Sequence, residues 1–222
     1  PFVAKLWDIG IDPALVVRSV EECDEACHDD ITVATSLLEA RILAGNVAQA
    51  GLPMQLLNKN WSQTKFYEAK MAEAKERYLK HNSTEYNLEP DLKNAPGGLR
   101  DIHTVGWISK RYFRVTNLFG LVQQEFITEK EFDELQEAED FLWLIRHHLH
   151  KIAKRNENRV LFDYQRLIAE RIGYRDNSHP NAAVEQFMRD YYRYAMSNST
   201  LSEMLTQHYY ETLIEARLPD EQ

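Results

Sequence analysis

The stretch that decides the fold class is TEKEFDELQEAEDFLWLIRHHLHKI, residues 128–152. Thr128 followed by Glu131 is a capping-box pattern, in which both side chains satisfy backbone N–H groups at the start of a helix. Apolar residues then recur at spacings of three and four, namely Leu135, Ala138, Leu142, Ile145, Leu149 and Ile152. This spacing places them on one face of an α-helix. The stretch therefore predicts a long helix with one buried stripe.

Helical patterns extend to both sides of this stretch. They predict helices over residues 66–81, 99–113 and 164–172, and a last one after Pro180 that continues or bends at Asn198-Ser199. Only eight glycines and seven prolines interrupt the 222 residues, as is typical of a mainly helical protein. Because the long helices are joined by short loops, we expect a mainly α fold built as an antiparallel helical bundle.

The first 45 residues read differently. Residues 2–9, 15–20 and 31–35 are short runs rich in apolar and β-branched residues, which predict strands, although the third run could equally begin a helix. Three strands are too few for a self-sufficient sheet. We therefore expect residues 1–45 to be the last strands of an α/β domain whose earlier part is absent from this chain.

Composition narrows the function classes. The net charge of −9 disfavours a general nucleic-acid binder, because neutralising phosphates requires a basic face. Cys23 and Cys27 form neither a disulfide framework nor a zinc pattern and are expected to be reduced thiols. With no signal peptide and no long apolar run, we expect a soluble, cytoplasmic protein that binds no membrane.

The most informative motif for function is NAPGGLRDIH, residues 94–103. A proline and two glycines before a helix predict uncovered backbone N–H groups, and a helix N-terminus favours phosphate. Arg100 adds a planar donor fork for phosphate or carboxylate, and Asp101 could hold a ribose hydroxyl, a metal-bound water or Arg100 itself. An ordinary turn before a capped helix remains the alternative.

A second candidate is Asp8, which lies between Trp7 and Ile9 on the first predicted strand. A strand carboxylate flanked by apolar residues can point into a metal site on one face of a sheet. Two further ligands would be needed for magnesium-assisted transfer, and none stands nearby in a suitable pattern.

Taken together, the motifs resemble one enzyme family. Residues 87–93 leading into Pro96-Gly97-Gly98-Leu99-Arg100-Asp101-Ile102-His103 are similar to the signature of the bifunctional uridylyltransferase/uridylyl-removing enzymes. Segments 6–10, 17–19, 30–41, 141–150 and 158–165 resemble the same family, in order along the chain. One departure is Ala14-Leu15-Val16, where members of the family carry Gly-His-Ser.

The resemblance implies a polymerase-β-like nucleotidyltransferase domain, of which residues 1–45 are the C-terminal remnant, followed by a helical domain over residues 46–222. The parent enzyme is expected to transfer UMP from UTP to a tyrosine of protein P-II with Mg²⁺. The Gly-Gly and Asp-x-Asp motifs should lie upstream. The uridylyl-removing domain and the domains that sense glutamine as effector should lie downstream. We therefore expect this chain alone to be inactive.

For the site, the resemblance implies that Asp8 is the third catalytic, metal-binding carboxylate. The residues expected to contact nucleotide are Arg100, Asp101, Gly97 and Gly98, with Arg41 and Glu39 as weaker candidates. Two alternatives remain open: a helical protein-interaction or regulatory domain, and a fragment of glutamine synthetase adenylyltransferase, which carries a related Gly-Gly-hydrophobic-Arg-Asp-Ile turn.

Overall fold

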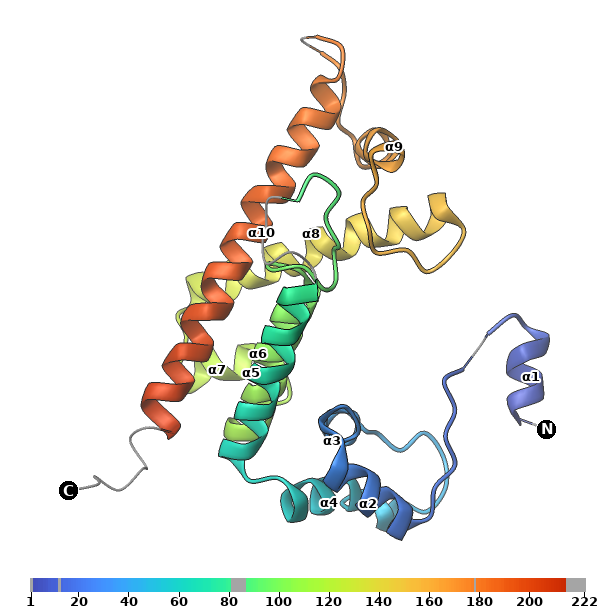
Figure 1. Cartoon of the computed structure of the whole chain (residues 1–222), viewed down its shortest axis with the longest axis vertical. Helices are drawn as coiled ribbons and strands as arrows, with labels where there is room; N and C mark the ends of the chain where they lie inside the picture. The colour runs from blue at the N-terminus through green and yellow to red at the C-terminus, as the bar shows by residue number, and fades with distance from the viewer. Residues whose placement is uncertain (1, 12, 81–86, 178, 215–222) are drawn as a thin grey trace. The chain divides into compact units, whose positions relative to one another are not determined.

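The computed structural model describes residues 2–11, 13–80, 87–177 and 179–214 (Figure 1). It consists of two compact units, residues 1–62 and residues 63–222. Each unit has its own set of helices, and each is described by itself. Residues 82–98 break the helical pattern of the sequence, and residues 82–86 of this break lie outside the described residues.

The first unit is helical where strands were predicted. Its elements are α1 (Phe2–Asp8), α2 (Val20–Asp29), α3 (Ile31–Leu38), a 3-10 turn (Val47–Gln49) and α4 (Leu52–Asn60). The strand prediction for residues 2–9 is wrong, and residues 15–19 belong to no regular element. Of the two alternatives for residues 31–35, the structure has the helix. No strand occurs in the described parts of the chain, where the one β-type pairing is an isolated bridge between Asp91 and Arg159.

Local capping explains why two of these segments are helical. The Ser19 side chain accepts from the N–H of Glu22, and the Glu22 carboxylate accepts from the N–H of Ser19, so a full capping box starts α2. The Asp30 carboxylate likewise accepts from the N–H of Thr32 at the start of α3. Short β-branched runs do not distinguish a buried helix from a strand, and here the caps decide between them.

A small core holds α2, α3 and α4 together. Its buried apolar residues are Cys27, Ala34, Leu38, Leu56, Leu57 and Trp61. The Trp61 indole N–H donates to the Cys27 carbonyl oxygen over 2.6 Å, which ties the end of α4 to α2. Cys23 and Cys27 are not joined by a disulfide.

The second unit contains the long helices. They are α5 (Gln63–Lys80), α6 (Leu99–Phe113), α7 (Phe119–Gln123), α8 (Glu129–Ala153), α9 (Phe162–Ile172) and α10 (Ala182–Tyr209), followed by a π-helical turn (Tyr210–Ile214). The bounds of α6 match the prediction. The capping box of Thr128 and Glu131 is confirmed at the start of α8. The predicted bend at Asn198 is absent, because α10 continues through it.

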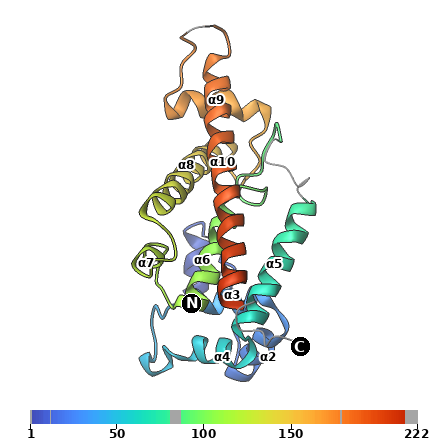
Figure 2. The ribbon, with the colours of Figure 1, turned by 90° about the vertical axis from the view of Figure 1, so that its left-hand side faces the viewer.

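The stripe predicted on α8 forms part of the main core. Leu135, Ala138, Leu142, Ile145 and Leu149 are buried, and Ile152 packs against them from the rim. Figures 1 and 2 show α8 running obliquely across α10, with which it packs. None of the described helices is long and apolar enough to cross a lipid bilayer.

The directions of the helices correct the expectation of an antiparallel bundle. α5 is antiparallel to α6, since Arg77 meets Asp101 while Gln63 bonds to the Arg111 carbonyl. α6 and α10, however, run parallel: Asn198 contacts Gly98 at one end, and Ser109 meets Tyr209 at the other. Short loops impose antiparallel neighbours, but α7, α8 and α9 intervene between α6 and α10 and return the chain to the starting end.

The Pro96-Gly97-Gly98 turn sits directly on α10. The Asn198 side-chain amide donates to the carbonyl oxygens of both Gly97 (2.8 Å) and Gly98 (3.1 Å). Gly97 has a φ of +76°, and a Cβ there would lie 2.1 Å from the Ala195 carbonyl oxygen. Glycine is required at this position both by its backbone conformation and by the close approach of α10.

We predict that Gly97→Ala strongly destabilises the second unit. The left-handed backbone costs a residue with a Cβ about 1–2 kcal/mol, and displacing α10 adds about 1–3 kcal/mol of overpacking. The measurement is the free energy of unfolding from urea denaturation.

Gly106→Ala is the matched control on α6, because a Cβ at Gly106 meets nothing within 4 Å. Replacing a mid-helix glycine should raise the free energy of unfolding by about 0.5–1 kcal/mol. Equal effects of the two substitutions would contradict the docking of the turn on α10.

Candidate functional site

The backbone N–H groups of the turn before α6 are used within the turn itself. The Gly97 N–H donates to the Asp101 carboxylate (2.7 Å), and the Gly98 N–H donates to the Ala95 carbonyl (2.9 Å). The next two N–H groups donate to the carbonyl oxygens of residues 92 and 93, both over 2.9 Å. Both glycines are buried. The expectation that these N–H groups are uncovered for phosphate is therefore wrong.

Asp101 is the centre of a buried polar network. Its side chain is 1% exposed and accepts from the Arg77 guanidinium over 2.8 Å, and Arg77 in turn donates to the Asn94 carbonyl over 3.0 Å. Burial raises the pKa of Asp101, and the Arg77 charge, the Tyr78 hydroxyl and the Gly97 N–H oppose that rise. The carboxylate pairs with Arg77 of α5 rather than with Arg100.

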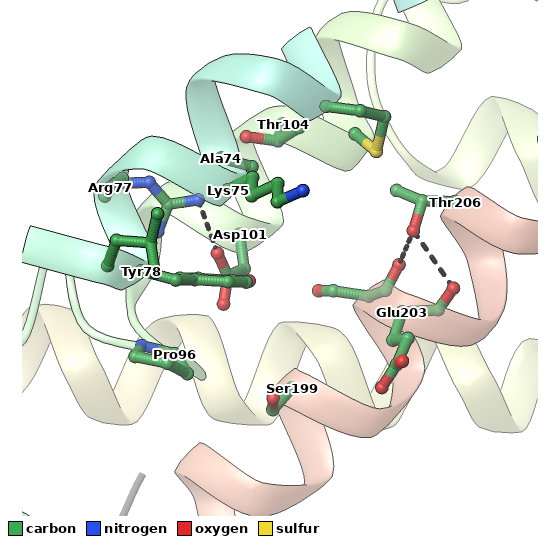
Figure 3. A pocket seen from close by; sticks show the side chains of 13 residues that line it. Ala74, Lys75, Arg77, Tyr78, Pro96, Asp101, Thr104, Ser199, Glu203 and Thr206 are labelled. Carbon is green, nitrogen blue, oxygen red and sulfur yellow. Dashed lines mark hydrogen bonds and ion pairs between the residues drawn. The ribbon is translucent and has the colours of Figure 1, made fainter. Parts of the chain in front are cut away.

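A cavity of about 410 Å³ lies beside this network. Figure 3 shows Arg77 and Tyr78 of α5, Asp101 and Thr104 of α6, and residues of α10 around it. Lys75 and Glu203 supply one charge of each sign, and Pro96 and Met71 supply apolar wall. The mixed lining fits a small polar organic molecule rather than a bare phosphate chain.

Arg100 points its charge away from this network. Its guanidinium carbon lies 5.2 Å from the centroid of the Trp107 ring, two turns along the same face of α6. Its guanidinium makes no hydrogen bond and no ion pair with the described residues. Partial burial lowers the pKa of Arg100, and the nearby Glu73 carboxylate opposes that shift. Of the four predicted residues in the motif, Arg100 is the one whose side chain is available to a ligand.

The other predicted site residues belong to the first unit. Asp8 ends α1 and is exposed, Glu39 caps the end of α3, and Arg41 lies in the exposed segment after it. These three residues lie in the first unit, whereas the motif at residues 94–103 lies in the second.

The described residues contain no group of three or more His, Cys, Asp or Glu side chains that could hold a metal ion. They do not by themselves fit the expected Mg²⁺.

Two buried cations on α5 were not predicted from the sequence. The Lys70 ammonium lies 4.2 Å from the centroid of the Trp107 ring and bonds to Glu73, and its side chain is 2% exposed. Arg77 is 10% exposed. α5 reads as a polar surface helix, and the spacing of Lys70 and Arg77 by two turns shows only that these two residues share a face.

Comparison with known proteins assigns the chain to a class. It is 66% identical to a bifunctional uridylyltransferase/uridylyl-removing enzyme of Psychrobacter sp. (strain PRwf-1), over 99% of this chain and 24% of the relative. The same kind of enzyme from Psychrobacter cryohalolentis is 64% identical (99% of this chain, 24% of the relative) and that from Acinetobacter baumannii 52% (99% and 25%). The chain thus spans about a quarter of the length of these relatives. No solved structure was found to match it.

The relatives define the class as bifunctional uridylyltransferase/uridylyl-removing enzymes. The model of one family, described as GlnD PII-uridylyltransferase, matches residues 65–206, which is most of the second unit. The chain belongs to this family.

We predict that Asp101→Asn lowers the free energy of unfolding by about 3 kcal/mol, because breaking a buried pair strands the remaining charge of Arg77. The double variant Arg77→Met/Asp101→Asn should recover part of the loss, since it leaves no buried charge unpaired. Urea denaturation of both variants measures this coupling.

Asp163→Asn on the exposed start of α9 is the control and should change the free energy of unfolding by no more than about 0.5 kcal/mol. An Asp101→Asn variant as stable as this control would show that the Arg77–Asp101 pair is unimportant to the fold.

Proposed function

We propose that the intact protein transfers UMP from UTP to a tyrosine of protein P-II, as a bifunctional uridylyltransferase/uridylyl-removing enzyme of nitrogen regulation. The observation that carries this proposal is the 66% identity to such an enzyme over 99% of the chain. The match of the family model to residues 65–206 supports it. The same matches disfavour the adenylyltransferase alternative.

Within the motif, we assign nucleotide contact to the residue whose side chain is available to a ligand, and positioning roles to the others. Arg100 contacts the nucleotide, because its guanidinium is half-buried and unpaired among the described residues. Asp101 acts through others, since its carboxylate holds Arg77 and the Gly97 N–H. Gly97 and Gly98 act by allowing the turn to dock on α10. Asp101, Gly97 and Gly98 are therefore positioning residues for Arg100.

The first unit is proposed to belong with the nucleotidyltransferase domain of the intact protein. Helix α1 buries none of its residues, and large apolar side chains remain exposed at Phe2, Trp7, Ile9, Leu15, Val16 and Val17. Such a run of exposed apolar surface is typical of a segment that packs against another part of a protein. Asp8 remains our proposal for one ligand of the Mg²⁺ that the family resemblance implies, with Glu39 and Arg41 as weaker nucleotide contacts.

We predict that the 222-residue chain alone does not uridylylate P-II. It spans about a quarter of its relatives, and the described residues lack a metal cluster. The measurement is incorporation of radiolabelled UMP into P-II, with the intact protein as positive control. Incorporation by the chain alone that is abolished by Asp8→Ala would contradict the prediction.

In the intact protein, Arg100→Met should raise the KM for UTP about tenfold, the effect of losing one charge-assisted hydrogen bond to phosphate. Steady-state kinetics with P-II measures it. Arg189→Met, an exposed cation on α10, is the control and should leave the KM for UTP unchanged. An unchanged KM in Arg100→Met together with lost P-II binding would favour the interaction-domain alternative.

A further inference from the structure

Three cations from three separate segments are brought together beside the motif. The Arg100 N–H donates to the Lys93 carbonyl over 2.9 Å, so the start of α6 is tied to the preceding loop. The backbone N–H of Leu92, the residue before Lys93, donates to the Asn158 carbonyl over 2.8 Å. The Asn158 side chain in turn accepts from the Arg146 Nε over 2.8 Å. This chain of bonds gathers Lys93, Arg100 and Arg146, which charge–charge effects also couple.

The charge of Asp91 raises the pKa of Lys93 and Arg146, and that of Glu73 raises the pKa of Arg100, but both carboxylates also make other hydrogen bonds. Asp91 accepts from the backbone N–H groups of Lys93 (2.8 Å) and Asn94 (2.7 Å), which closes the loop. Glu73 bonds to the buried Lys70. In the described part of the chain, neither Lys93 nor Arg100 has an ion-pair partner. The three cations thus form a cluster with excess positive charge in a protein whose net charge is −9.

Aromatic rings hold the two arginines in place. Arg100 lies over Trp107 of α6, and the Arg146 guanidinium lies 5.1 Å from the centroid of Trp143 on α8. His103 stands between the two indoles, with its ring centroid 5.8 Å from that of Trp107 and 6.4 Å from that of Trp143. Stacked guanidinium groups lose less freedom on binding than free ones. The row of rings therefore pre-organises the donors.

Burial and the repulsion between Lys93 and the two arginines disfavour the charges of the cluster. Each of the three side chains is partly buried, and burial lowers the pKa of Lys93, Arg100 and Arg146. Repulsion from Arg100 and Arg146 lowers the pKa of Lys93 further. The Arg146 Nε and Nη2 donate to the side-chain oxygens of Asn158 and Asn156. The Nη1 makes no hydrogen bond to the part of the chain that the structure describes. An anion bound here would relieve the repulsion and satisfy these donors.

We propose that Lys93, Arg100 and Arg146 form a clamp for the polyphosphate of a nucleotide, so that Lys93 and Arg146 are binding residues in addition to Arg100. The inference deepens the proposed function and rests on it for the identity of the nucleotide. Lys93 supplies a point charge, and the two guanidinium groups supply planar donors.

The chemistry favours a polyphosphate over a single carboxylate or phosphate. Three cations from a loop and two helices match an anion with several charged groups in a row. Trp143 is 42% exposed beside Arg146 and offers a ring on which a base can stack. The backbone N–H groups of the turn are occupied, so recognition falls to side chains.

The test uses the intact protein with UTP and P-II. Lys93→Met and Arg146→Met should each raise the KM for UTP about tenfold while kcat changes less than twofold, as expected for one charge-assisted bond to phosphate in both ground and transition states. Inorganic tripolyphosphate should inhibit competitively against UTP, with an inhibition constant that rises by the same factor in both variants. Lys130→Met, an exposed lysine at the start of α8, and Arg189→Met are the matched controls.

A raised KM in Lys93→Met would not come from unfolding. Removing an unpaired cation from a repulsive cluster should not lower the melting temperature of this variant. Unchanged KM and inhibition constants in both variants, with an active wild type, would overturn the clamp. An inactive wild type would instead refute the proposed function. Direct binding of tripolyphosphate by calorimetry then decides the clamp alone: loss of binding in both variants upholds it, and retention overturns it.

Discussion

The close approach of the Gly97 backbone to Ala195 is the contact on which the second unit depends. It brings the turn before α6 against the middle of α10, where the Asn198 amide holds two successive carbonyl groups. A side chain at Gly97 would separate the helices. Because α6 and α10 run parallel from this point, the contact also sets the register down to Ser109 and Tyr209. The glycines of the motif are therefore explained by packing.

This docking determines which parts of the motif remain available for binding. With the N–H groups and Asp101 committed to the turn and to Arg77, only the Arg100 side chain remains for a ligand. The same bonds that close the turn place Lys93 beside Arg100, and Asn158 places Arg146 near both. Gly97, Gly98 and Asp101 thus hold the turn in place, while Arg100 with Lys93 and Arg146 concentrates positive charge on an acidic protein.

Periodicity predicted the helices of the second unit well, because a long buried stripe such as that of α8 has one interpretation. It failed over residues 2–9 and left residues 31–35 undecided, because short apolar runs fit either a strand or a helix. The Ser19–Glu22 capping box, which is readable in the sequence, marks the start of α2. Arg77 as the partner of Asp101 was not predictable, because no local pattern shows which face of the polar helix α5 turns inward.

Arg100 and Arg146 are available to a ligand in this account, whereas Arg77 is not. The most direct test follows the arginine Nε–H resonances of the 222-residue chain by NMR during titration with inorganic tripolyphosphate. The account predicts shifts for Arg100 and Arg146, which face the ligand, and none for Arg77, which is held by Asp101 and Asn94. Shifts confined to Arg77, or no shift at Arg100 at saturating tripolyphosphate, would contradict it, since the anion would then bind elsewhere or not at all.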